Sequence, residues 1–217
     1  RGFDESVCFR GGMHDYYQWR IEFGRDIRRT DGRYMTDVWT EEAVQFISRH
    51  QKEPFFLHLT YNAPHGPLQV PAEETAPFLD KPGLTQSVKS IYGMIRRMDK
   101  GVARVLETLD RLGLRENTVV FFTSDNGPQF GGKGEQCANR FNCNFRGAKG
   151  VTFEGGIRVP MIIRWPDGLP VKREVREMVH FADWFPTILA MTGVPLPKDH
   201  LPLDGIDQLP GVRGEKG

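Results

Sequence analysis

The sequence predicts an α/β fold, in which a largely parallel or mixed sheet is flanked by helices on both faces. Candidate strands and helices alternate along the chain, as they do in proteins of this class. Residues 117–124 and 159–166 are continuous apolar runs, typical of strands buried on both faces. Between Thr85 and Leu112, apolar residues recur at steps of three and four, which predicts one long amphipathic helix.

The first elements lie before this helix. Residues 1–35 show no clean period, so we expect irregular structure there, with a short helix near Tyr17–Ile21. Residues 36–51 predict a helix with Thr40 as its N-cap. Residues 54–60 are a short apolar strand candidate that leads into a proline-rich segment.

The later elements complete the alternation. Gly113 follows the long helix and is a natural stop signal. A long glycine-rich loop separates the two buried-strand candidates, and residues 182–193 predict a further helix. From Val194 onward the sequence is rich in Pro, Leu and Asp, which predicts an extended tail.

Charge and composition exclude several classes of function. The 217 residues carry 29 Lys plus Arg against 28 Asp plus Glu, a net charge of +1, which gives no argument for nucleic acid as a partner. No apolar run approaches the ~20 residues that span a bilayer, so we expect no membrane span. Three Cys are too few for a disulfide framework, although Cys137 and Cys143 could either form one bridge or remain thiols.

Asp125, Asn126 and Gly127 follow the first buried-strand candidate, in "FFTSDNGP". These residue types are typical of a turn, because Asp and Asn make local hydrogen bonds and Gly tolerates positive φ. Asp and Asn also offer hard oxygen ligands that suit Ca²⁺ or Mg²⁺. Two ligands do not make a calcium site, so on these residues alone a turn is the simpler interpretation.

The loop that follows favours function. It carries four cations, Lys133, Arg140, Arg146 and Lys149, against two acids, Glu135 and Glu154. This excess of positive charge suits an anionic ligand bound beside a metal, and the alternative is a solvated surface loop. His65 lies between Pro64 and Pro67, which stiffen the backbone and suit a ligand or proton donor. No H-E-x-x-H, G-x-S-x-G or Walker pattern occurs in the sequence.

Four segments, taken in order, resemble a known family: "FFLHLTYNAPHGPLQVP", "FFTSDNGP", "FRGAKGVTFEGGIRVP" and "FADWFPTILAMTGVPLP". They are similar to the type I, formylglycine-dependent sulfatases, arylsulfatase-like members of the alkaline phosphatase superfamily. The resemblance implies an alkaline phosphatase-like α/β fold and hydrolysis of aryl or carbohydrate sulfate esters. It also implies an exported protein, whether periplasmic, secreted or lysosomal.

The resemblance implies a role for each matching residue. Asp125 and Asn126 match metal ligands for the active-site Ca²⁺, with Mg²⁺ as the alternative. Lys149 matches a lysine that grips a sulfate oxygen. His65 matches a histidine that contacts the sulfate and assists departure of the alcohol, so His65 and Lys149 are the expected catalytic and substrate-binding residues.

One part of the family pattern does not match. Formylglycine is made from Cys or Ser in a C/S-x-P-x-R motif, and none of Cys8, Cys137 and Cys143 lies in one. We therefore expect residues 1–195 to be the central and latter part of the catalytic domain, without the nucleophile segment and inactive in isolation. Residues 196–217 are then an extended linker toward a C-terminal subdomain.

Two other functions compete with a sulfatase. A phosphodiesterase or phosphonate monoester hydrolase of the same superfamily would share the metal and the cations. A non-catalytic protein that binds sulfated glycans would keep only the cleft.

Overall fold

The computed structural model describes residues 2–131 and 137–215, which divide into two compact units. The first unit contains the chain up to Leu114 together with residues 122–161. The second contains residues 115–121 and the chain from Ile162 onward. All residues predicted for the functional site lie in the first unit.

The N-terminal part of the first unit forms a small antiparallel sheet. Its strands are β1 (Val7–Cys8), β2 (Arg20–Phe23) and β3 (Asp26–Arg29), in the order β1-β2-β3. The helix predicted near Tyr17–Ile21 is wrong, because a two-residue loop after Phe23 closes β2 and β3 into a hairpin.

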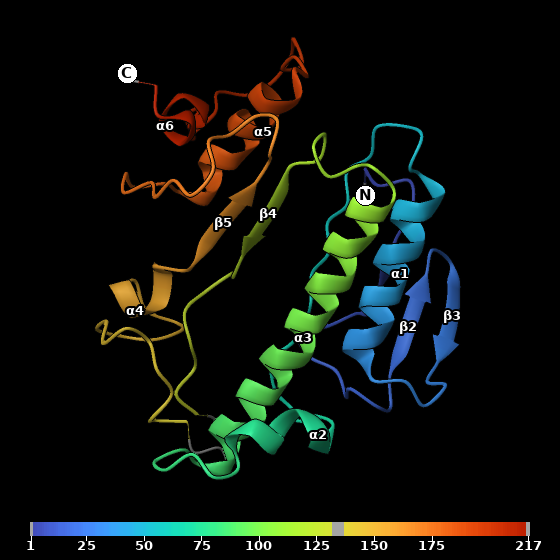
Figure 1. Ribbon diagram of the computed structural model, residues 1–217, viewed down its shortest axis with the longest axis vertical. Coiled ribbons are helices and arrows are strands. Elements are labelled where there is room, and N and C mark those ends of the chain that lie inside the picture. The colour runs from blue at the N-terminus through green and yellow to red at the C-terminus, as the bar shows by residue number, and fades with distance from the viewer. Residues whose placement is uncertain (1, 132–136, 216–217) are drawn as a thin grey trace. The chain divides into compact units, whose positions relative to one another are not determined.

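Two long helices form the body of this unit and lie side by side in Figure 1: α1 (Met35–Arg49) and α3 (Gln86–Arg111). Thr85 caps α3 by accepting a hydrogen bond from the backbone NH of Val88 at 3.3 Å, so the predicted long helix is confirmed. Thr40 is not the N-cap of α1. It lies inside the helix, buried, and its hydroxyl donates to the Thr36 carbonyl at 2.9 Å.

Short helices complete the first unit: α2 (Ala72–Thr75), the 3₁₀ helix η1 (Ala76–Phe78) and α4 (Glu154–Ile157). Helix α2 is held to α3 by Glu74, whose side chain is 0% exposed. Three partly exposed cations of α3 surround this carboxylate: Arg96, Arg97 at 3.1 Å and Lys100 at 2.5 Å. A buried carboxylate is tolerated only when it is paired in this way.

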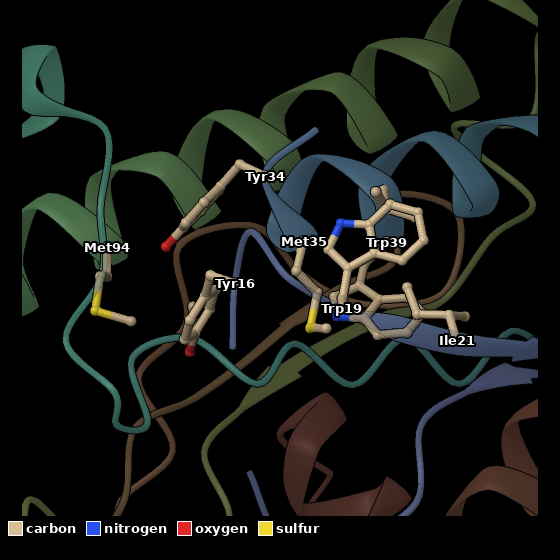
Figure 2. Close-up of a cluster of buried hydrophobic side chains, with 9 residues drawn as sticks. Tyr16, Trp19, Ile21, Tyr34, Met35, Trp39 and Met94 are labelled. Carbon is tan, nitrogen blue, oxygen red and sulfur yellow. The ribbon is translucent and has the colours of Figure 1, made fainter. Parts of the chain in front are cut away.

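An aromatic core joins the small sheet to α1 (Figure 2). Met35, Val38 and Trp39 form the buried stripe of α1, and Trp19 and Ile21 cover it from the N-terminal segment. Tyr16 stacks on Tyr34 with 5.2 Å between ring centroids. This core also receives Ala63 and Met94, so it reaches both the proline-rich segment and α3.

Residues 54–60 are extended but are not a strand, contrary to the sequence prediction. Alternate side chains are exposed, with Phe56, His58 and Thr60 on the open side, so the period of a strand is present. A strand also needs a hydrogen-bonded neighbour, and the described residues supply none for this segment.

The other two strand predictions are confirmed as β4 (Val120–Thr123) and β5 (Met161–Arg164), which pair in a two-stranded sheet. Neither is buried on both faces as predicted, since most of their residues are only half-buried and Ile162 is 61% exposed. The predicted sheet is largely parallel or mixed and flanked by helices, and the described residues at this place form a sheet of two strands.

The second unit contains η2 (Phe181–Asp183), α5 (Trp184–Thr192) and α6 (Leu209–Arg213). Helix α5 confirms the predicted helix. Helix α6 differs from the predicted extended tail, because Leu209 and Val212 pack with Met191 in a small core. No helix among the described residues has the length and apolar character required to cross a membrane.

Candidate functional site

The residues from Ser124 to Gly127 form a turn directly after β4. The Ser124 hydroxyl donates to the Asn126 carbonyl at 3.0 Å, and the Asn126 side-chain amide donates to the Gly127 carbonyl at 3.2 Å. The carboxylate of Asp125 is exposed and has no partner in the described part of the chain. The turn that the local sequence predicts is therefore present, and it leaves a carboxylate available.

Gly127 ties this turn to α4 through backbone contacts. Its NH donates to the Gly156 carbonyl at 2.8 Å. A Cβ at Gly127 would lie 1.9 Å from the Gly155 carbonyl oxygen, so only glycine fits here. The glycines of this region serve close packing of backbone on backbone.

Lys149 belongs to the same packed region. Its NH donates to the Pro128 carbonyl at 2.9 Å, and the Gly155 NH donates to the Arg146 carbonyl at 2.8 Å. A Cβ at Gly155 would lie 2.1 Å from the Gly147 carbonyl oxygen. We call Gly127, Gly147, Gly155 and Gly156 the glycine framework; it brings the Asp125 turn and the Lys149 turn together.

The oxygen ligands of the Asp125 turn suit a hard divalent cation but are too few for one. Ca²⁺ takes six to eight oxygen ligands. Asp125 offers a carboxylate, and Asn126 offers a side-chain oxygen because its amide nitrogen is engaged elsewhere. Within the described residues, no group of three or more His, Cys, Asp or Glu could hold a metal ion. The described residues by themselves do not complete a calcium site here.

The side chain of Lys149 is exposed and lines a cavity of about 730 Å³, which is formed by Phe130 and by residues between 138 and 151. Cys137 anchors this segment, since it is buried against Val88 and Ile91 of α3. In the described part of the chain, Cys137 and Cys143 are thiols. The cations predicted for this loop include Lys133, which lies outside the described residues together with Glu135.

His65 lies in a segment that the aromatic core holds in place. The Tyr16 hydroxyl donates to the His65 carbonyl at 2.9 Å, and the Tyr34 hydroxyl donates to the Gln69 carbonyl at 2.8 Å. The Trp39 indole NH donates to the Asn62 side chain at 3.0 Å. Burial raises the pKa of both tyrosines, so their hydroxyls stay protonated and keep donating.

The ring of His65 is exposed, and its tautomer follows from its neighbour. Nδ1 lies 3.1 Å from the Gly66 carbonyl, which can only accept, so Nδ1 carries the proton in the neutral ring. Nε2 then faces outward, without a partner among the described residues. No hydrogen bond or ion pair within that part of the chain joins His65 to the Asp125 turn or to Lys149.

Little in the sequence indicates which residues hold the His65 segment in place. Tyr16 and Tyr34 lie in a stretch without periodicity, which only its density of aromatic residues distinguishes, and Trp39 lies in the helix predicted for residues 36–51. Arg140 lines the same cavity as Lys149, although in the sequence it was one cation among several.

Comparison with known proteins identifies the family of this chain. The sulfatase family model matches residues 1–194. Steryl-sulfatase of Mus musculus is 39% identical over 192 residues, which are 87% of this chain and 29% of that protein. N-acetylgalactosamine-6-sulfatase of Canis lupus familiaris is 36% identical over 183 residues, 83% of this chain and 33% of that protein.

A solved structure is also similar: Ps i-CgsB in complex with k-i-k-neocarrahexaose. It is 33% identical with a TM-score of 0.88, and the match covers 100% of this chain and 51% of that one. The predicted alkaline phosphatase-like fold class is thereby confirmed. The chain spans about a third of the length of the curated relatives named above. Because the family model covers nearly the whole chain, this protein belongs to the sulfatase family.

Proposed function

We propose that the complete polypeptide carrying this sequence is a hydrolase of sulfate monoesters of aryl or carbohydrate substrates. The observation that supports this most is the glycine framework, in which Lys149 and the Asp125 turn are joined by backbone hydrogen bonds. A cation and a pair of hard oxygen ligands on one rigid support suit an oxyanion such as sulfate.

The roles follow from charge and protonation. The Lys149 ammonium contacts a sulfate oxygen and offsets the negative charge that the oxygens carry. His65, protonated at Nε2, donates that proton to the oxygen of the departing alcohol, while Nδ1 stays bound to the Gly66 carbonyl. The hydrogen bond from the Tyr16 hydroxyl to the His65 carbonyl holds the backbone of His65 in position.

Two cofactors follow from the family, a divalent metal ion and formylglycine, and this sequence has candidate residues for the metal ion alone. Asp125 and Asn126 would hold part of a Ca²⁺ site, with Mg²⁺ as the alternative, and a bound cation would polarise the sulfate. Formylglycine does not fit any residue of this sequence, because no C/S-x-P-x-R motif occurs in the 217 residues. This chain by itself is therefore expected to be inactive.

The substrate and the setting are part of the proposal. The oligosaccharide in the Ps i-CgsB complex supports a sulfated glycan as the substrate. The similarity to a steryl-sulfatase supports a smaller sulfate ester as the alternative. By family, the protein is proposed to be exported. Residues 1–195 are proposed as part of the catalytic domain, with the tail from residue 196 leading toward a further subdomain.

The test is release of inorganic sulfate by the complete polypeptide from an aryl sulfate and a sulfated sugar. Lys149→Ala and His65→Ala should each lower kcat/KM about 100-fold or more, while Arg111→Gln, which removes an exposed charge at the end of α3, should not. Faster turnover of a phosphodiester or phosphonate ester would support the competing hydrolase. Saturable glycan binding without any turnover would support a non-catalytic binding protein.

A further inference from the structure

The cavity beside Lys149 contains a second cation that the proposed chemistry does not use. Among the described residues that line it, the ionisable side chains are Arg140 and Lys149, and none is acidic. A volume of about 730 Å³ lies in the range of small-molecule sites, which is roughly 300–1,000 Å³. The cavity thus has room for more than one sulfate group.

Arg140 is held in place without being neutralised. It is partly buried, and its backbone NH donates to the carbonyl of the anchored Cys137 at 3.0 Å. Burial lowers the pKa of its guanidinium from the ordinary value, and Cys137 and Tyr92 lie close enough to oppose this. An arginine still keeps its charge. No carboxylate pairs with this guanidinium in the described part of the chain.

The wall around Arg140 is fixed by amide groups. The side-chain amide of Asn139 donates to the Gly83 carbonyl. The Asn142 amide donates to the Phe145 carbonyl at 2.8 Å and to the Gly147 carbonyl at 3.3 Å, and thereby links this wall to the glycine framework. These bonds leave the side-chain oxygens of Asn139 and Asn142 available as acceptors for hydroxyl groups.

Three aromatic residues also line the cavity: Phe130, Phe141 and Phe145. Phe141 is 69% exposed, so its ring is accessible to a ligand in the cavity. Ring faces, amide oxygens and fixed cations together suit an oligosaccharide that carries negative groups.

We propose that Arg140 binds a second anionic group of the substrate, so that the substrate is a glycan with at least one sulfate or carboxylate beyond the sulfate that is cleaved. The planar guanidinium can form two parallel hydrogen bonds with either group. The inference rests on the proposed function, because it takes Lys149 as the contact for the cleaved sulfate. It gives Arg140 a role in specificity.

The test compares three disaccharides as substrates of the complete polypeptide. One carries a single sulfate, one carries a second sulfate, and one carries a carboxylate in its place. We expect the wild type to prefer one or both of the doubly charged sugars about 10- to 100-fold in kcat/KM. Arg140→Gln should abolish this preference through KM, Arg140→Lys should keep part of it, and Arg111→Gln should retain it.

Each outcome decides the matter. A wild type without preference, or an Arg140→Gln variant that folds and keeps it, would overturn the assignment while sulfate release still supports the proposed function. If no sugar releases sulfate, the proposed function fails and binding is measured by calorimetry with the same three sugars. If only the Arg140→Gln variant binds the doubly charged sugars with a higher Kd than the wild type, the proposed Arg140 site is supported. Equal Kd values for all variants would contradict it.

Discussion

Replacing Gly127 by alanine tests whether the glycine framework positions the site. The new Cβ would lie 1.9 Å from the Gly155 carbonyl oxygen and 2.8 Å from its carbon, both backbone atoms that cannot rotate away. Relief requires the Asp125 turn and α4 to separate by about 1 Å. Overpacking of this kind costs about 1–3 kcal/mol of stability. A displacement of about 1 Å in a catalytic arrangement costs about 100-fold in rate.

The assay is kcat/KM for sulfate release by the complete polypeptide, with the free energy of unfolding measured in urea. Gly12→Ala is the matched control, because a Cβ there meets nothing within 4 Å and Gly12 does not have a positive φ. We expect the control to stay within twofold of the wild type. If Gly127→Ala also stayed within twofold and equally stable, the framework would not position the site.

Three further predictions concern stability, positioning and metal. Glu74→Gln should cost about 3 kcal/mol in urea unfolding, the low end for a broken buried pair, because its cations are partly exposed. Glu41→Gln, at a carboxylate that is 35% exposed, should cost about 0.5 kcal/mol or less, and equal losses would contradict the burial argument. Burial acts to raise the pKa of Glu74, but hydrogen bonds from Lys100 and Arg97 outweigh it, so the pKa in the folded state lies below 4.5. The stability that this carboxylate contributes is therefore present above pH 4.5 and is lost as the pH falls through the folded-state pKa. The Glu74→Gln variant should not show this loss. Tyr16→Phe removes the hydrogen bond to the His65 carbonyl and should lower kcat about three- to tenfold with KM unchanged, and a change in KM alone would point to a role in binding. Chelation should abolish activity and added Ca²⁺ restore it, with Asp125→Asn requiring more Ca²⁺; full activity in chelator would exclude the metal.

Helices α3 and α5 could be predicted because their signals are local. Apolar spacing, Thr85 at the start and Gly113 at the end specify α3 without reference to the rest of the chain. Residues 54–60 show the limit of such signals. Exposed and half-buried side chains alternate there as in a strand. A strand also requires a hydrogen-bonded neighbour, and the sequence of one segment does not show whether it has one.

The candidate site residues could be predicted from the sequence for a different reason. Asp125 and Lys149 follow turn chemistry and glycine patterns that can be seen locally, and family resemblance gave them roles. The contacts that join them could not be predicted, because Gly127 meets Gly155 and Gly156 across a long loop. Likewise, nothing near His65 in the sequence indicates that Tyr16 holds its carbonyl.

The most direct test of the account is a double-mutant cycle of Asp125→Ala and Lys149→Ala on kcat/KM for sulfate release. If both residues act on one sulfate group, the second substitution should cost little after the first, and the coupling should exceed about 1 kcal/mol. Losses that simply add would show two independent sites and contradict the central claim.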